Sequence, residues 1–128
     1  MNNVNNQSSH ALNEILKEYA GLPEYSGMST PNVGTKSLFG DYPINIAATR
    51  GLMGEVATLL AHGANINAMG EHGYTPLHNA VEQNHIEIVR FLLKSGADAT
   101  MSNDDGDTPV ELAKLMGYEG MLRLMANS

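Results

Sequence analysis

The sequence predicts an all-α solenoid of three helix-turn-helix repeats preceded by an N-terminal helix. Thr75-Pro76 recurs as Thr108-Pro109, 33 residues later, and the same step backwards leads to Tyr42-Pro43. Leu59-Leu60 recurs with the same period as Leu92-Leu93. Several motifs in register over a fixed period indicate stacked helical units, each of which buries its apolar face against its neighbours.

Two short antiparallel helices are expected in each repeat, and the middle copy predicts them most clearly. Thr75 can cap free N–H groups at a helix start, and Pro76 at the first helical position lacks the donor that would be orphaned there. Residues 77–81 then place an apolar stripe on this first helix. Residues 86–93 form the apolar face of the second helix, which Gly96 is expected to end.

These motifs resemble the ankyrin-repeat family over roughly residues 37–128, with repeats at about 37–69, 70–102 and 103–128. The middle copy matches the family pattern best, through Gly73-Tyr74-Thr75-Pro76-Leu77-His78, Ala80, His85-Ile86-Glu87-Ile88-Val89, Leu92-Leu93 and Gly96-Ala97-Asp98. The outer copies depart from the pattern at Tyr42, Asn45, Glu55 and Val110-Glu111. Such drift is expected in terminal repeats, because each of them faces water on one side.

The segment before the repeats is expected to comprise a disordered tail at residues 1–9 and an N-terminal helix and loop at 10–36. Apolar residues from Leu12 to Tyr19 share one helical face, and Gly21-Leu22-Pro23 stops the helix. Two interpretations are open: the helix shields the apolar edge of the first repeat, or it docks a partner. The loop is long for a compact domain, and such loops are often functional.

Composition narrows the possible functions. Fourteen acidic and seven basic side chains give a net charge of −7, which disfavours binding to the phosphates of nucleic acid. The absence of Cys excludes disulfides, thiolate zinc sites and cysteine nucleophiles. The first residues do not resemble a signal peptide, and no apolar run reaches the ~20 residues that span a bilayer. We therefore expect a cytoplasmic protein without a membrane partner.

No catalytic residue, cofactor or metal site is predicted. His78 and His85 occupy the positions at which histidines of the family hold turns by bonding backbone groups. His85-Ile86-Glu87 also lacks the spacing of a zinc-binding helix. Residues 103–107 resemble the start of a calcium loop, but the alignment that this requires puts Met101 and Leu112 at ligand positions. We therefore do not expect an enzyme.

The resemblance implies that partners bind at the turn tips and on the exposed face of the first helix of each repeat. Carried over position by position, this surface comprises Leu38, Phe39, Asp41, Thr49 and Arg50 in the first repeat, Met69, Glu71, His72, Tyr74, Glu82 and Gln83 in the second, and Ser102, Asp104, Asp105, Asp107, Leu115 and Met116 in the third. Aromatic and Met side chains supply contact area, while the carboxylates steer a partner of opposite charge. Two alternatives stay open: Phe39 and Tyr74 pack on an adjacent turn, and the acidic tip at 103–107 is only solvated.

We therefore expect a non-catalytic protein-protein interaction module, monomeric when free, whose partner is another protein of basic character. One form would be a stoichiometric inhibitor, such as an immunity protein that neutralises a basic nuclease toxin. The alternative is a scaffold or adaptor, including a secreted effector, that binds several partners. An enzyme or a metal protein is the least favoured hypothesis.

Overall fold

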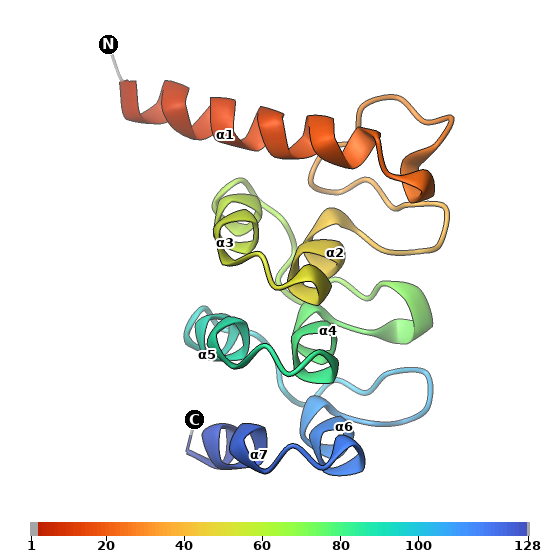
Figure 1. Ribbon diagram of the computed structural model, residues 1–128, viewed down its shortest axis with the longest axis vertical. Helices are drawn as coiled ribbons and strands as arrows, with labels where there is room; N and C mark the ends of the chain where they lie inside the picture. The colour runs from red at the N-terminus through yellow and green to blue at the C-terminus, as the bar shows by residue number, and fades with distance from the viewer. Residues whose placement is uncertain (1–2, 128) are drawn as a thin grey trace.

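The computed structural model describes residues 3–127, with side chains from residue 9 onward. Its helices are α1 (Asn3–Ala20), α2 (Pro43–Arg50), α3 (Met53–Ala61), α4 (Pro76–Glu82), α5 (Ile86–Lys94), α6 (Pro109–Met116) and α7 (Glu119–Ala126), with short 3-10 turns η1 (Pro23–Tyr25) and η2 (Glu71–Gly73). The pairs α2–α3, α4–α5 and α6–α7 stack on one another, and α1 lies at one end of the stack (Figure 1). The predicted all-helical solenoid is confirmed.

The inner helices α2, α4 and α6 each begin at a proline, as the repeated motif predicts. The hydroxyls of Thr75 and Thr108 accept hydrogen bonds from backbone N–H groups of the first turn, at 3.3 Å in both helices. Gly51 and Gly117 follow α2 and α6 in the left-handed conformation, with φ of 76° and 74°, and Asn84 takes this role after α4 at 58°. A left-handed residue ends a helix and turns the chain toward the next one.

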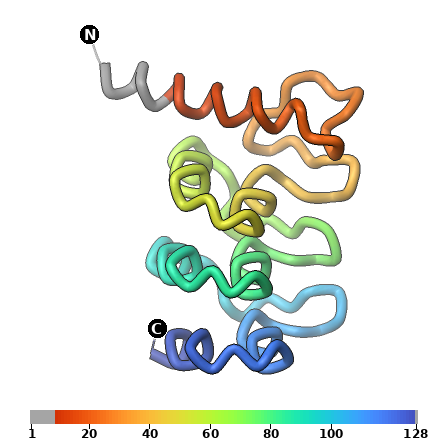
Figure 2. Tube along the Cα trace, viewed as in Figure 1, coloured from red at the N-terminus to blue at the C-terminus, as the bar shows by residue number. Residues whose placement is uncertain are grey.

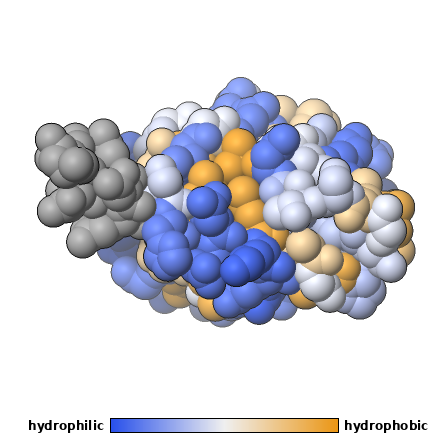
Figure 3. Space-filling view, turned by 90° about the horizontal axis from the view of Figure 1, so that it is seen from above, coloured by the Kyte–Doolittle hydropathy of each residue, from blue (hydrophilic) through white to orange (hydrophobic). Residues whose placement is uncertain are grey.

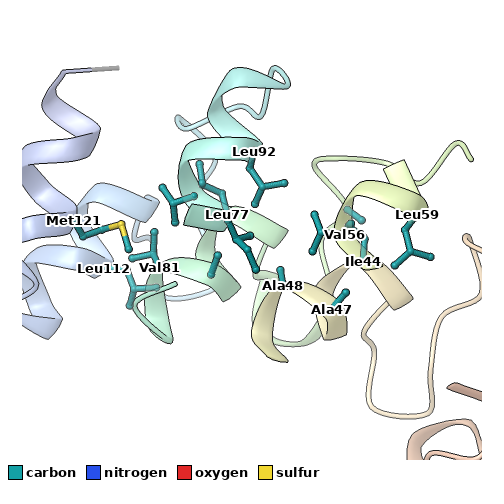
Figure 4. Close-up of a cluster of buried hydrophobic side chains, with 14 of the residues drawn as sticks. Ile44, Ala47, Ala48, Val56, Leu59, Leu77, Val81, Leu92, Leu112 and Met121 are labelled. Carbon is teal, nitrogen blue, oxygen red and sulfur yellow. The ribbon is translucent and has the colours of Figure 1, made fainter. Parts of the chain in front are cut away.

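One apolar core runs through the whole stack. Its buried side chains follow one another from Ile44 and Leu59 to Leu112 and Met121 (Figure 4). At one position of each inner helix lies a fully buried alanine, at residues 47, 80 and 113, which lets neighbouring helix pairs approach closely. Burying one Leu or Ile contributes roughly 1.5–3 kcal/mol. Because these contacts join different repeats, the array is expected to unfold as one unit.

Helix α1 covers the first repeat, and this supports the shielding interpretation of the N-terminal segment. Leu16 joins the main core, whereas Tyr19 and Tyr25 form a second cluster with Ile46 of α2. The Tyr19 hydroxyl donates a 2.7 Å hydrogen bond to Glu55 of α3. Seen from this end, a central apolar strip of the surface is bordered by hydrophilic residues (Figure 3).

Helix α1 begins at Asn3 rather than at residue 10, so residues 3–9 of the expected disordered tail are helical. The physical reason is that neither Pro nor Gly interrupts this stretch. Residues 1 and 2 lie outside the described part of the chain. The expected loop at 21–36 is irregular apart from η1, and the Tyr25 hydroxyl fixes it by donating to the Thr35 carbonyl at 2.9 Å.

Three hairpin loops, at residues 37–42, 70–75 and 103–108, project from the stack on the side away from α3, α5 and α7 (Figure 2). Each loop is closed by a backbone hydrogen bond with the same spacing, Ser37 to Asp41, Gly70 to Tyr74 and Asn103 to Asp107, at 2.7–2.9 Å. The loops therefore hold equivalent backbone positions along one edge of the array.

Buried polar side chains tie each inner helix to the next hairpin. Asn45 donates through its Nδ2 to the Tyr74 carbonyl at 3.1 Å, and His78 makes the equivalent bond through its Nε2 to the Asp107 carbonyl at 2.8 Å. The Nδ1 of His78 accepts the Thr75 N–H at 3.2 Å, which places the proton of the neutral ring on Nε2. Burial lowers the pKa of His78, although its bond to the Asp107 carbonyl opposes this shift.

The Tyr19–Glu55 contact should couple α1 to the first repeat. We expect Tyr19→Phe to lower the free energy of unfolding by about 1–3 kcal/mol, because Glu55 loses a buried hydrogen-bond donor. A double-mutant cycle with Glu55→Met, which removes the acceptor oxygens, measured by urea denaturation, should give a coupling of about 1 kcal/mol. Strictly additive effects of the two substitutions would show that the Tyr19–Glu55 contact does not couple α1 to the first repeat.

His78 should make stability depend on pH. Its folded-state pKa lies below its ordinary value of 6.5, so the unfolded chain binds the proton first as the pH falls. The stabilisation is therefore complete above about pH 6.5 and declines as the pH falls from there toward the lowered pKa.

We expect His78→Asn to remove this decline, because Asn45 makes the equivalent bond in the first repeat without a titrating ring. Urea denaturation of both proteins at about pH 7.5 and 5.5 measures the difference in slope. The raised pKa values of Glu24 and Asp41 are common to both proteins and cancel in the comparison. Equal losses of stability on acidification would contradict the assignment.

Candidate protein-binding surface

The three hairpin loops and the exposed sides of α2, α4 and α6 form one continuous surface, which we call the hairpin face. The structure places every sequence-predicted site residue at the molecular surface on or beside this face. Twelve of them are exposed: Leu38, Phe39, Arg50, Met69, Glu71, His72, Gln83, Ser102, Asp104, Asp105, Leu115 and Met116. The other five are half-buried: Asp41, Thr49, Tyr74, Glu82 and Asp107.

The first hairpin presents apolar side chains to solvent. Met69, just before the second hairpin, is 44% exposed, and Leu38 and Phe39 of the first hairpin are 60% and 55% exposed. Their backbone is nevertheless fixed: the Leu38 N–H donates to the Glu24 carbonyl at 2.7 Å, and the Phe39 N–H donates to the Ser37 hydroxyl at 3.3 Å. Apolar side chains held outward on a fixed loop can contact a partner at a low cost in conformational entropy. The Phe39 side chain is thus more than half exposed, and it belongs to neither core cluster.

The chemistry of the hairpin tips changes along the array. Positions 38 and 39 are apolar in the first hairpin, and their equivalents are Glu71 and His72 in the second, where the two side chains lie 3.6 Å apart. In the third hairpin the equivalents are Asp104 and Asp105. Among the described residues, the ion pairs involve Glu14, Glu71 and Glu87, so the aspartates of the third tip form no ion pair there.

Hydrogen bonds between loops keep these tips in register. The Glu71 N–H donates to the Asp41 carboxylate at 2.9 Å, and the Asp104 N–H donates to the His72 carbonyl at 3.0 Å. Gly73 has φ of 72°, and a side chain there would meet Asp104. The tips therefore form one surface rather than three independent loops.

A hollow of about 210 Å³ lies where the N-terminal segment meets the hairpin face. It is lined by Leu22, Glu24, Asp41, Ile46, Thr49 and Arg50. Burial raises the pKa of Glu24, and its repulsion from Asp41 adds to the shift. Burial also raises the pKa of Asp41, although the Glu71 N–H that it accepts opposes this. Arg50, which also lines the hollow, is the cation near these carboxylates, and its charge opposes the rise in the pKa of Glu24.

Sequence analysis missed Glu24, because this residue lies in the N-terminal loop and outside the repeat register. The sequence feature that could have revealed this packing is Glu55, an acidic residue at the position occupied by Ile88 and Met121 in the later repeats. Its hydrogen bond to Tyr19 shows that the departure serves the packing of the N-terminal segment, which also carries Glu24 to the face.

Some predicted residues already have partners within the chain. The Tyr74 hydroxyl donates to Glu82 at 2.9 Å, and its ring lies 5.4 Å from that of His78. Burial raises the pKa of Tyr74 to about 12, and the bond to Glu82 acts in the same direction. Arg50 lies 6.0 Å from the centre of the Tyr19 ring. Tyr74 thus packs on its own repeat, which leaves Phe39 as the aromatic side chain most open to a partner.

The inner helix of the last repeat adds a second apolar area to the face. Leu115 and Met116 are 71% and 43% exposed, whereas the equivalent positions of the middle repeat hold Glu82 and Gln83. Along the face, apolar and acidic areas therefore alternate.

The described residues contain no group of three or more His, Asp or Glu side chains that could hold a metal ion. Within the same part of the chain, no helix is long and apolar enough to cross a membrane. The hairpin face thus offers apolar contact, charge and hydrogen bonding.

Comparison with known proteins yields ankyrin-repeat matches. A family model described as ankyrin repeats (many copies) matches residues 59–113. The putative E3 ubiquitin-protein ligase XBAT34 of Arabidopsis thaliana is 33% identical over 123 residues, which cover 94% of this chain and 30% of that protein. Human ankyrin repeat domain-containing protein 40 is 40% identical over 80 residues, 57% of this chain and 22% of that protein.

Human protein phosphatase 1 regulatory subunit 27 is 44% identical over 57 residues, 44% of this chain and 37% of that protein. The chain thus spans less than two fifths of the length of each of these relatives. The Arabidopsis relative bears the name of an enzyme, but the similarity extends over less than a third of it. The stacked helix pairs, the periodic hairpins and these matches show that the chain is an ankyrin-repeat protein.

Proposed function

We propose that the hairpin face binds a basic segment of another protein in a one-to-one complex. Ankyrin repeats are protein-protein interaction modules, and stacked repeats use such extended surfaces for binding. The observation that carries the proposal is the third hairpin, whose exposed aspartates form no ion pair with any described residue. This hairpin lies on the same edge of the array as the exposed apolar tip of the first hairpin (Figure 2). The free protein is then a monomer.

The arrangement of the face gives the bound partner a direction. Apolar groups of the partner fit the first hairpin at Leu38 and Phe39, and its basic groups fit the third hairpin at Asp104 and Asp105. A face of three repeats can bury on the order of 800 Å² of each protein, which is sufficient for a stable complex. Most of the affinity then comes from the apolar anchors, while the carboxylates speed association.

The finer proposal is a stoichiometric inhibitor that occludes a basic enzyme, in the manner of a toxin-neutralising immunity protein. The human relative named as a regulatory subunit of a phosphatase supports control of an enzyme by binding. The alternative is a scaffold or adaptor, of which a secreted effector would be one form. The alternation of apolar and acidic areas supports it, because each area can engage a different protein. Both roles are non-catalytic.

Affinity capture distinguishes the two roles. The tagged protein is incubated with lysate of its native cell and washed at moderate salt, and the eluate is identified and quantified by mass spectrometry. A single basic protein at a one-to-one ratio supports the inhibitor, and its enzymatic activity can then be assayed with and without this chain. Several substoichiometric proteins support the adaptor. The absence of any basic protein from the eluate would contradict the proposed charge of the partner.

Removing the acidic tip should slow binding. We expect Asp104→Asn, Asp105→Asn and Asp107→Asn together to lower the association rate with the captured partner about tenfold at low salt, and to weaken its salt dependence. Stopped-flow or biosensor kinetics at two salt concentrations measure both effects. The control variant Glu14→Gln, Glu87→Gln and Glu119→Gln removes the same charge away from the hairpin face. An equal effect in both variants would attribute the result to net charge alone.

Removing the apolar tip should speed dissociation instead. We expect Phe39→Ser to raise the dissociation rate about tenfold while leaving the association rate nearly unchanged, because an apolar aromatic contact acts mainly after encounter. The melting temperature should stay the same, since the side chain is largely exposed. Met28→Ser, an exposed apolar position in the N-terminal loop, is the matched control. Unaltered dissociation of the Phe39 variant would exclude the first hairpin from the interface.

A further inference from the structure

A groove lies between α5 and α7, on the side of the array opposite the hairpins. It has a volume of about 490 Å³ and is lined by Arg90, Leu93, Lys94, Leu124 and Asn127. Leu93 and Leu124 give it an apolar floor, and both of its charged lining side chains are cationic. A cationic groove is unexpected in a chain whose net charge is −7.

A second hollow lies between α3 and α5 on the same side. Its volume is about 450 Å³, and it is lined by Ala57, Leu60, Ala61, Ala64, Ile66, Phe91 and Ser95. Helices α3, α5 and α7 form one row in the stack (Figure 1), so the two hollows follow one another along this row. We call the two hollows together the outer-helix groove.

The spacing of the two hollows suits a helical ligand. Packed helices lie roughly 8–10 Å apart, and the hollows are separated by one such step. A helix presents side chains i and i+7 on one face, about 10.5 Å apart. Two apolar side chains of one helix can therefore enter the two hollows together.

The cationic side chains around the groove favour a ligand that carries carboxylates. Arg90 on α5 and Arg123 on α7 occupy equivalent positions of successive repeats, and Lys94 lies one turn beyond Arg90. The acidic side chain beside them is Glu87, whose carboxylate lies 3.4 Å from Arg90. The Arg90 side chain stays about half exposed in this pair, and Lys94 is exposed, so both can accept further contacts from carboxylates.

We propose that the outer-helix groove binds an acidic amphipathic helix of a second protein, with apolar residues at i and i+7 in the two hollows and carboxylates against Arg90 and Lys94. This site is separate from the hairpin face and has the opposite charge preference. The protein then holds a basic partner on one side and an acidic one on the other.

The test uses a fluorescein-labelled helical peptide that carries Leu at i and i+7 and Glu at the flanking positions. Fluorescence anisotropy with the full chain at low salt should show saturable binding. Arg90→Gln with Lys94→Gln should weaken the affinity about three- to tenfold. Lys36→Gln with Lys114→Gln removes the same charge elsewhere and should leave the affinity unchanged.

Two further reagents separate this site from the hairpin face. Replacing both Leu residues of the peptide by Ser should abolish binding, whereas Asp104→Asn, Asp105→Asn and Asp107→Asn together should not weaken it. Absence of saturable binding would overturn the proposal. So would an equal loss of affinity in the groove variant (Arg90→Gln with Lys94→Gln) and in the control variant (Lys36→Gln with Lys114→Gln). The proposal would also be overturned if the protein self-associates and Arg90→Gln with Lys94→Gln abolishes this self-association, because a second copy of the chain would then occupy the groove.

Discussion

The fold depends on the burial of two apolar faces of each helix pair against the pairs beside it. The fully buried Ala80, for example, can lie between neighbouring repeats only if both are present, so no helix pair is stable alone. The same stacking fixes the hairpins, because the polar bridges from Asn45 and His78 cross from one repeat to the next. Stability and the geometry of the binding surface therefore come from the same interfaces between repeats. A loss of packing at one interface is expected to displace the adjoining hairpins as well as to lower the free energy of unfolding.

The first and the last of the described repeats depart from the repeat pattern in different ways. At the N-terminal end, α1 adds a layer, and Glu55 replaces the apolar residue of the repeat pattern because it receives the Tyr19 hydroxyl. Burial and this bond raise the pKa of Tyr19, so its hydroxyl stays protonated and remains the donor. At the C-terminal end, Glu111 stands where His78 stands in the repeat before it, and its carboxylate accepts the Thr108 N–H at 3.0 Å within its own repeat. Glu55 and Glu111 thus replace the contacts of the repeat pattern by contacts of their own, with the N-terminal segment and within the last described repeat.

The periodic part of the fold could be predicted from the sequence because each repeat carries its own local signals. Pro76 and Pro109 start helices, and the left-handed Gly51 and Gly117 end them, whatever lies elsewhere in the chain. The N-terminal segment has no such internal copy to compare with. Its helix starts earlier than expected, and the contact of Tyr19 with Glu55 joins residues 36 positions apart, which no local pattern reveals. The positions of the candidate surface followed from the repeat register, whereas Glu24 entered it through that non-local packing.

The distribution of charge reflects a difference between the outer helices, which are closely packed, and the hairpin tips, which are not. The outer helices pack closely, and the charged side chains of α5 and α7 are held at positions set by that packing, such as Arg90 and Arg123. The hairpin tips are held by backbone hydrogen bonds, so their side chains can vary without loss of structure; Leu38, Glu71 and Asp104 occupy one equivalent position. Excess negative charge is therefore tolerated at the tips, where Asp104 and Asp105 are solvated. The fold does not require these side chains, so their chemistry is free to differ from one hairpin to the next.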